Sequence, residues 1–319
     1  MTDSLRCVCC GEANFRQLFP AMTSGFSVAE CQTCGARRTI PDLTDEEVAR
    51  FYPQTYYGEG NKRFNWLLEQ ASRAIRKERA RSIAARLGTP GPVMDVGCGR
   101  GIILAELQDL GFQSFGIELS DAAATHARSL GIDVGTDLFD PRYQPGTFVG
   151  VTFWHSLEHI RRADLALARA VELLKPGGVL GIAVPNSGSL QATLFSRYWF
   201  HLDVPRHYHH LSMKNVEQMM AAAGLNVFAR STLSLEQNPY GFVQSALNAV
   251  GMPENLLYSL LKDPSARTHA IGEHPLAAAA SALATPALAT VSLVASAVEA
   301  AVGRGGTVEL WARKPAAPG

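Results

Sequence analysis

The chain has 319 residues, of which 47% are hydrophobic and 18% are charged. This composition excludes a disordered chain and suggests roughly two domains, at about 150 residues per domain. The 29 Lys and Arg residues balance 29 Asp and Glu residues, so we expect no nucleic-acid partner, whose phosphates require clustered cations. The first residues carry no apolar run of the kind found in secretory signals, which predicts a cytoplasmic protein.

Two Cys-x2-Cys pairs, each followed by glycine, lie near the start of the chain with 20 residues between them. The four cysteines are Cys7, Cys10, Cys31 and Cys34. Four thiolates at this spacing suit a closed tetrahedral Zn²⁺ site, which is structural because it has no open position. Cys9 lies between two of these ligands and could replace one of them. We therefore assign residues 1–42 to a zinc-ribbon module.

Residues 43–88 are expected to form a helical linker or lid. Residues 43–60 contain a short helix and an aromatic turn, and apolar side chains at helical spacing predict one helix over residues 61–88. Gly88 is the expected stop of that helix. The helix carries eight Lys or Arg residues and two Glu residues, so its charged face could meet anionic lipid or water.

From Pro90 onward, short apolar strands alternate with helices, which predicts a parallel sheet with helices on both faces. The strand candidates in chain order are PVMDVG, QSFGIEL, IDVGTDL, FVGVTFW, GVLGIAV, LNVFARSTL and GTVELWARK. The helix candidates are GIILAELQDLG, AAATHARSLG and KNVEQMMAAAG. We assign residues 89–238 and 304–315 to this core.

A glycine-rich turn follows the first core strand and opens a helix. Its characteristic residues are Asp95, Gly97, Cys98, Gly99 and Gly101. The spacing is G-x-G-x-G, whereas the dinucleotide fingerprint requires glycine at the position of Ile102. Glu118 ends the second strand 21 residues after Gly97, where a carboxylate can bind two ribose hydroxyls. Together these features predict a cofactor that carries a nucleoside.

This part of the chain resembles the class I S-adenosylmethionine-dependent methyltransferases over roughly residues 90–235 and the last strand. DVGCGRG is similar to the first motif of that family, and WHSLEH and LKPGG are similar to its later landmarks. The strand that carries an Asp in the family is Phe148-Val149-Gly150-Val151 here and lacks it. The resemblance implies a Rossmann-like seven-stranded sheet with an antiparallel last strand, and methyl transfer from a sulfonium donor.

The resemblance also implies the residues that bind S-adenosylmethionine. They are Asp95, Gly97, Cys98, Gly99, Gly101, Glu118, Leu119, Asp137, Leu138, Trp154 and His155. The front end resembles the zinc-ribbon modules of bacterial methyltransferases, including enzymes that C-methylate nucleotide-linked sugars. Related zinc-ribbon enzymes methylate ribosomal RNA, so an RNA methyltransferase is the alternative function, and a non-catalytic scaffold is another.

Two histidine-rich segments are the candidates for acceptor chemistry. The segment from His155 to His159 has the H-x-x-E-H spacing of a zinc protease, but no third ligand is identifiable downstream. The denser segment, residues 201–210, follows the fifth core strand. Methylation of a hydroxyl or carbon acid needs a base, and histidine suits that task near neutral pH. We predict His207 as the base, with His159 second and Arg206 orienting the acceptor.

The alternative for this loop is structural, with Pro205 fixing a turn and Arg206 paired to Asp203. Residues 239–303 are expected to form an apolar helical insertion in which residues 276–298 carry no charge over 23 positions. A buried helical hairpin broken or kinked at Pro286, a homodimer surface, a patch on a membrane and a membrane span are the alternatives.

The sequence thus predicts a cytoplasmic methyltransferase, with membrane association through residues 239–303 as one outcome. Its acceptor is a small molecule, for which a sugar or a lipid-linked compound methylated on oxygen or carbon is compatible. The acceptor, the methylated atom and the oligomeric state are not determined by the sequence.

Overall fold

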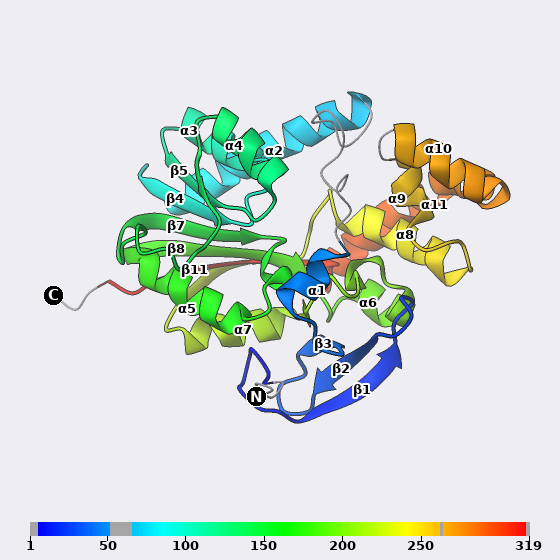
Figure 1. Ribbon diagram of the computed structural model, residues 1–319, viewed down its shortest axis with the longest axis horizontal. Coiled ribbons are helices and arrows are strands. Elements are labelled where there is room, and N and C mark those ends of the chain that lie inside the picture. Colours follow the sequence, from blue (N-terminus) through cyan, green and yellow to red (C-terminus); the bar gives the residue numbers. More distant parts are fainter. Residues whose placement is uncertain (1–5, 52–65, 262–263, 317–319) are drawn as a thin grey trace.

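A seven-stranded sheet forms the centre of the computed structural model, which describes residues 6–51, 66–261 and 264–316. Its strands are β4 (Pro92–Val96), β5 (Gln113–Ile117), β6 (Asp133–Gly135), β7 (Phe148–Trp154), β8 (Leu174–Pro185), β10 (Asn226–Ser231) and β11 (Thr307–Arg313). The strand order is β10-β11-β8-β7-β4-β5-β6, and β11 runs antiparallel to both of its neighbours (Figure 1). The predicted α/β class and the antiparallel last strand are confirmed.

The carboxyl ends of β4, β5 and β7 lie at one edge of the sheet, because these strands pair in parallel. β7 reads FVGVTFW and is buried along nearly all of its length, as expected for a strand covered on both faces. In the β4–β7 register, Asp95 is the partner of Thr152. The glycine-rich turn and the WHSLEH segment therefore leave the sheet side by side.

Helices cover both faces of this sheet, as predicted. On one face pack α2 (Trp66–Leu87), α3 (Ile102–Asp109) and α4 (Asp121–Ser129); on the other pack α5 (Ala163–Leu173) and α7 (Met213–Ala222). Ser120 and Ser212 begin α4 and α7 as N-caps whose side chains accept backbone N–H groups. The helix predicted over 61–88 is present from residue 66, and residues 61–65 lie outside the described part.

The N-terminal module is a small antiparallel sheet with an unexpected fourth strand. Its strands are β1 (Phe15–Pro20), β2 (Ser27–Cys31), β3 (Arg37–Ile40) and β9 (His209–His210), in that order. β9 comes from the histidine-rich loop of the core, so the module is joined to the core by backbone hydrogen bonds. The helix α1 (Asp45–Ala49) follows with a Thr44–Glu47 capping box, and the predicted aromatic turn over residues 52–60 lies outside the described residues.

The remaining helices gather beside the core in Figure 1. They are α6 (Leu190–Phe195), α8 (Asn238–Ala249), α9 (Leu256–Leu261), α10 (Pro264–Glu273) and α11 (Pro275–Ala301). In the described residues, short 3₁₀ helices span Leu157–His159, Ser196–Tyr198 and Phe200–Leu202.

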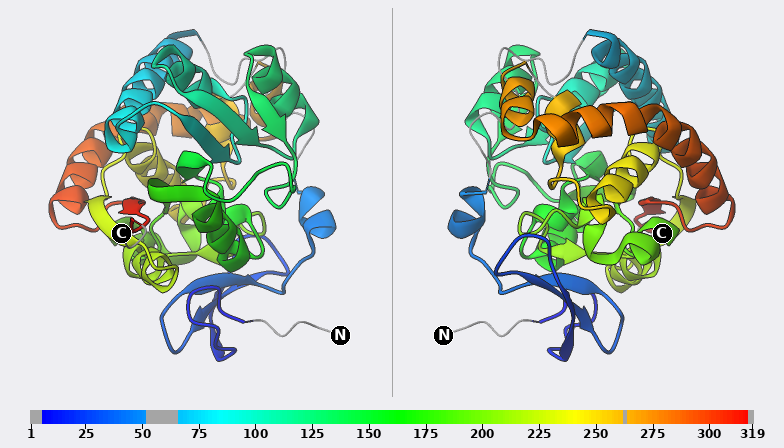
Figure 2. Two further views of the ribbon diagram at one scale, coloured as in Figure 1. Left: turned by 90° about the vertical axis from the view of Figure 1, so that its left-hand side faces the viewer. Right: turned by 90° about the vertical axis from the view of Figure 1, so that its right-hand side faces the viewer.

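Of the alternatives for residues 276–298, the structure rules out the buried helical hairpin. The run forms one continuous helix, α11, with Pro286 inside it (Figure 2). Most of its apolar surface faces outward, with Leu276 and Leu283 exposed by 86% and 83%. Among the described residues, α11 is the one helix long and apolar enough to cross a membrane.

Candidate functional site

The glycine-rich loop joins β4 to α3 at the carboxyl edge of the sheet. Gly97, Gly99 and Gly101 have φ angles of 79°, 54° and 72°, in the left-handed region that favours glycine. A Cβ added to Gly97 would lie 2.5 Å from the Cβ of Ser156, whereas a Cβ on Gly99 would meet nothing within 4 Å. The loop is thus closely packed at Gly97 and leaves open space at Gly99. An anionic group can approach the N–H groups at the start of α3 from that side.

Glu118 lies across from this loop at the end of β5, as predicted. Its carboxylate accepts the N–H of Gly99 and the N–H of Ser120, both at 2.8 Å. The adjacent Leu119 is 79% exposed, so an apolar surface stands beside the buried acid. Farther along the same edge, Asp137 accepts the N–H of Phe139 at 2.8 Å. The buried carboxylate of Glu118 can bind the ribose hydroxyls of a nucleoside cofactor, and the open space at Gly99 can take an amino-acid portion of the same cofactor.

Two predicted cofactor residues turn their side chains into the protein core. Leu138 is 5% exposed and packs with the apolar cluster under α5 and α7. The Cys98 sulfur packs so closely on Gly116 that a Cβ there would lie 2.5 Å from it, and burial raises the pKa of this thiol. These two residues can reach a ligand at this edge only through their backbone atoms.

Asp95 is the buried acid of the loop. Its Oδ1 accepts a hydrogen bond from the Thr152 hydroxyl at 2.7 Å. Burial raises the pKa of Asp95 to about 7, and the nearby Glu118 acts in the same direction. The pairing with Thr152 depends on the strand register, and no motif in the sequence marks it.

The segment after β7 packs directly against the loop. Ser156 donates its hydroxyl hydrogen bond to the carbonyl of Val96 and fills the space beside Gly97. His155 has a φ of 52°, a left-handed conformation that is uncommon for a non-glycine residue. The Trp154 ring lies under the Arg79 guanidinium, 4.7 Å from the ring centroid. The following turn is a 3₁₀ helix of three residues, so the shared α-helical face that a protease motif requires does not form.

The two histidines predicted as bases, His159 and His207, lie close together at this turn with Glu158. Ligand atoms of Glu158, His159 and His207 all lie within 4.8 Å of one another. The rings of His159 and His207 meet edge to face with centroids 4.4 Å apart. Burial lowers the pKa of His207 well below its ordinary value, so this histidine is neutral near pH 7. The structure therefore brings together His159 and His207, which the sequence places in separate segments.

Arg206 points to Asp203, and the two side chains form an ion pair. The other oxygen of Asp203 lies 3.7 Å from Nε2 of His207. This is the pairing that the structural interpretation of the loop expects. We predicted that Arg206 orients the acceptor. In that role its guanidinium would have to bind the acceptor while it stays paired with the carboxylate of Asp203.

The other histidines of residues 201–210 have structural partners. His209 and His210 form β9, and His210 Nε2 lies 3.2 Å from the Thr39 hydroxyl of the ribbon. His201 is buried beside Trp199 and Phe200, and burial lowers its pKa to about 3. Most of this histidine-rich segment thus joins the module to the core.

The four predicted metal ligands converge in the ribbon. Cys7 and Cys34 have their sulfurs 3.4 Å apart, and Cys10 and Cys31 have theirs 3.6 Å apart. Four thiolates around Zn²⁺ would lie about 3.8 Å apart at Zn–S distances of about 2.3 Å, so this set fits a tetrahedral ion. Cys9 is not among the four converging cysteines.

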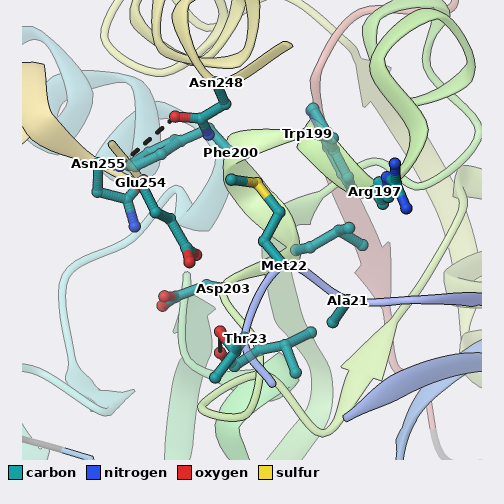
Figure 3. Close-up of a pocket in the computed structure, with 12 residues that line it drawn as sticks. Ala21, Met22, Thr23, Arg197, Trp199, Phe200, Asp203, Asn248, Glu254 and Asn255 are labelled. Carbon is teal, nitrogen blue, oxygen red and sulfur yellow. Dashed lines mark hydrogen bonds between the residues drawn. The ribbon is translucent and has the colours of Figure 1, made fainter. Parts of the chain in front are cut away.

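Asp203 also lines a recess between the ribbon, the histidine-rich loop and the C-terminal helices (Figure 3). Met22 and Thr23 of the ribbon, Glu254, and Asn248 of α8 contribute to its wall. The Asn248 side chain accepts the backbone N–H of Asn255 at 3.4 Å, which closes one side. Asp203 is the lining residue of this recess that also lies near His207, at 3.7 Å from its Nε2.

Residues 67–229 match the family model described as a methyltransferase domain. Over 123 residues the chain is 36% identical to the ubiquinone biosynthesis O-methyltransferase of Xanthomonas campestris pv. campestris (strain B100), covering 35% of this chain and 51% of the relative. The protein of that name from Methylococcus capsulatus (strain ATCC 33009 / NCIMB 11132 / Bath) is 33% identical over 132 residues, 39% and 55% of the two chains. The chain spans about half the length of the curated relatives it matches.

Among solved structures, geranyl diphosphate C-methyltransferase from Streptomyces coelicolor A3(2) is 14% identical, with a TM-score of 0.47. That likeness covers 74% of this chain and 75% of the other.

Proposed function

The chain belongs to the S-adenosylmethionine-dependent methyltransferases, and we propose that it methylates a small-molecule acceptor bound beside Glu158, His159 and His207. The observation that supports this proposal most directly is the packing of Ser156 on Gly97. It places the turn that carries Glu158 and His159 against the loop that would hold the donor.

The residues at the sheet edge fit S-adenosylmethionine. The open space at Gly99 and the α3 N-terminus would take its methionine end, and Glu118 would bind its ribose hydroxyls. Leu119 and Asp137 would border the adenine. The bound donor supplies an electrophilic methyl group on a sulfonium, and the protein orients a nucleophile in line with it.

On the acceptor side, His207 is our candidate for the base, with His159 second. Burial lowers the pKa of His207, so the side chain is neutral before reaction, and it can take a proton only where a nearby negative charge stabilises the imidazolium. The carboxylate of Asp203, 3.7 Å from Nε2, would stabilise the resulting imidazolium. The O-methyltransferase relatives favour an acceptor oxygen over carbon.

The ribbon is proposed to hold a structural Zn²⁺. The sulfur–sulfur distances suit one tetrahedral ion, and four thiolates form a closed ligand set for Zn²⁺. Zinc would order β3 and, through its pairing with β9, the loop that carries His207.

We further propose that the enzyme is cytoplasmic and rests on a membrane surface through α11. The outward apolar side chains of this helix suit the acyl–headgroup boundary. Its end is fixed to the core, because the buried Glu299 accepts the backbone and side-chain N–H groups of Gln191 at 2.7 and 3.0 Å. β11 follows directly and lies in the central sheet, which disfavours a crossing of the bilayer.

The proposed function is tested with a methyl-labelled donor and a metabolite extract. The extract is divided into a nuclease-treated, protein-free small-molecule fraction and a purified RNA fraction. We expect label to enter the small-molecule fraction and to identify the acceptor by mass spectrometry. Label confined to RNA would overturn the proposal in favour of an RNA methyltransferase.

A further inference from the structure

We propose that Glu158, His159 and His207 bind one divalent transition-metal cation at a site distinct from the four cysteines. The inference stands on the geometry of the three side chains. The role of this cation in methyl transfer to the acceptor rests on the proposed function, whereas the binding of the cation does not.

The carboxylate of Glu158 is the first observation. This residue is 2% exposed, and both carboxylate oxygens are buried without a hydrogen-bond partner in the part of the chain that the structure describes. The cationic group that faces it is His155, whose Nδ1 lies 3.7 Å from Oε1 and which is charged only when protonated. An ionised carboxylate in such surroundings is costly unless it is paired or binds a metal. Among the described side chains, this carboxylate has a histidine, and no Lys or Arg, within ion-pair distance.

The orientation of the two histidines is the second observation. Nδ1 of His159 lies 3.1 Å from the carbonyl of Arg206, and Nδ1 of His207 lies 3.0 Å from the carbonyl of His201. A carbonyl can only accept, so each Nδ1 carries the proton and each Nε2 carries the lone pair. Histidines that bind metals are commonly fixed in this way, by donating the other ring N–H to a backbone carbonyl.

Two imidazoles and one carboxylate are a recognised ligand set. They suit Zn²⁺, Mn²⁺, Fe²⁺ or Co²⁺ better than Mg²⁺ or Ca²⁺, which prefer oxygen ligands alone. Ligands of one such ion lie about 3–3.5 Å apart, so the cluster, now within 4.8 Å, would contract slightly on binding. Three protein ligands leave coordination positions open, as in catalytic metal sites.

The consequence for the enzyme concerns the acceptor oxygen. A cation here would bind that oxygen and lower the pKa of its hydroxyl, so the proton would leave to solvent. Coordination uses the Nε2 lone pairs, so His159 and His207 would be ligands in the metal-bound protein, and the role of base proposed above for His207 would apply to the protein without this cation. The cation would also tie the histidine-rich loop to the turn after β7.

The test measures metal binding and needs no acceptor. Full-length protein is prepared with one equivalent of zinc, which the four cysteines retain, and is then titrated with Co²⁺. We expect one further equivalent to bind, with the weak visible bands of nitrogen and oxygen ligands and without thiolate charge transfer. The Glu158→Gln variant should bind this equivalent at least tenfold more weakly. His269→Gln, an exposed histidine on α10, is the matched control.

Folding and cofactor binding are checked separately. Without added Co²⁺, Glu158→Gln should be no less stable than the wild type, because it removes a buried carboxylate that accepts no hydrogen bond from the described residues. Added Co²⁺ should raise the Tm of the wild type and the control but not of the variant. Equal Co²⁺ affinity in variant and wild type, or cobalt found with thiolate bands only, would overturn the site. Since S-adenosylmethionine affinity is measured independently, failure of the metal site is distinguishable from failure of the proposed function.

Discussion

Arg38 in the ribbon is the register partner of His209 in the core. The Thr39 hydroxyl next to it donates to the carbonyl of His207 at 2.6 Å, and the Thr39 N–H donates to the carbonyl of Tyr208 at 3.0 Å. The backbone that carries His207 is therefore held by the strand beside the four-cysteine cluster. The ribbon thus supports the proposed acceptor side, while the glycine-rich loop proposed to bind the donor lies on other elements.

We therefore expect loss of zinc from the ribbon to lower turnover while leaving the affinity for the methyl donor nearly unchanged. Cys10→Ser should lose the ribbon metal and lower turnover at least tenfold, because β3 no longer orders β9. Its Kd for S-adenosylmethionine should stay within about threefold of the wild type. Zinc content, calorimetry and steady-state rates provide the measurements. Cys9→Ser, outside the four converging cysteines, should keep both metal and turnover. Full turnover in zinc-free Cys10→Ser would refute the coupling.

Glu118 should dominate the binding of the donor's ribose. Glu118→Gln removes the charge that strengthens hydrogen bonds from ribose hydroxyls, a loss of about 1.5–3 kcal/mol. We expect the Kd for S-adenosylmethionine, measured by calorimetry, to rise at least tenfold. Glu78→Gln on the exposed side of α2 is the control and should bind as the wild type does. An unchanged Kd in Glu118→Gln would remove the assignment of the ribose site.

Asp95 should make the ligand-free protein less stable as the pH rises. Its pKa is about 7 when folded, against 3.8 for the unperturbed group, so between these values the folded chain binds more protons than the unfolded chain. The free energy of unfolding, relative to Asp95→Asn, should fall from about pH 4 to pH 7 and level off above. At about 1.4 kcal/mol per pKa unit, the full difference is at most about 4 kcal/mol.

Urea unfolding of both proteins across this range gives the difference directly. The Asn side chain can still accept the Thr152 hydrogen bond, which makes it a matched replacement. A difference that stays flat or rises with pH would contradict the raised pKa of Asp95.

The outward face of α11 should carry membrane binding. We expect the wild type to float with anionic liposomes and the double variant Leu283→Glu, Val294→Glu to remain in the soluble fraction. Leu165→Glu adds a charge to an exposed leucine on α5 and should float as the wild type does. A wild type that stays soluble and elutes as a dimer would instead assign this face to a second copy of the chain.

Local signals in the sequence predicted the parts of the fold that depend on neighbouring residues. The strand–turn–helix pattern at 92–109 predicted the donor loop, because its glycines require left-handed backbone and its flanking apolar runs require burial. The Cys-x2-Cys spacing predicted the converging thiols in the same way. For the run at 276–298 the sequence left a buried hairpin, a dimer surface, a membrane patch and a membrane span open, because hydrophobicity and one proline do not show which surface covers a helix.

The acceptor side depended on contacts that no local pattern records. Glu158 and His159 follow β7, whereas His207 is placed by the pairing of β9 with a strand from the other end of the chain. The sequence by itself determined the glycine-rich loop and the set of four thiols, since backbone conformation and spacing act over a few residues. Only the tertiary structure decided which histidines meet a buried carboxylate, because that depends on packing between segments distant in the chain.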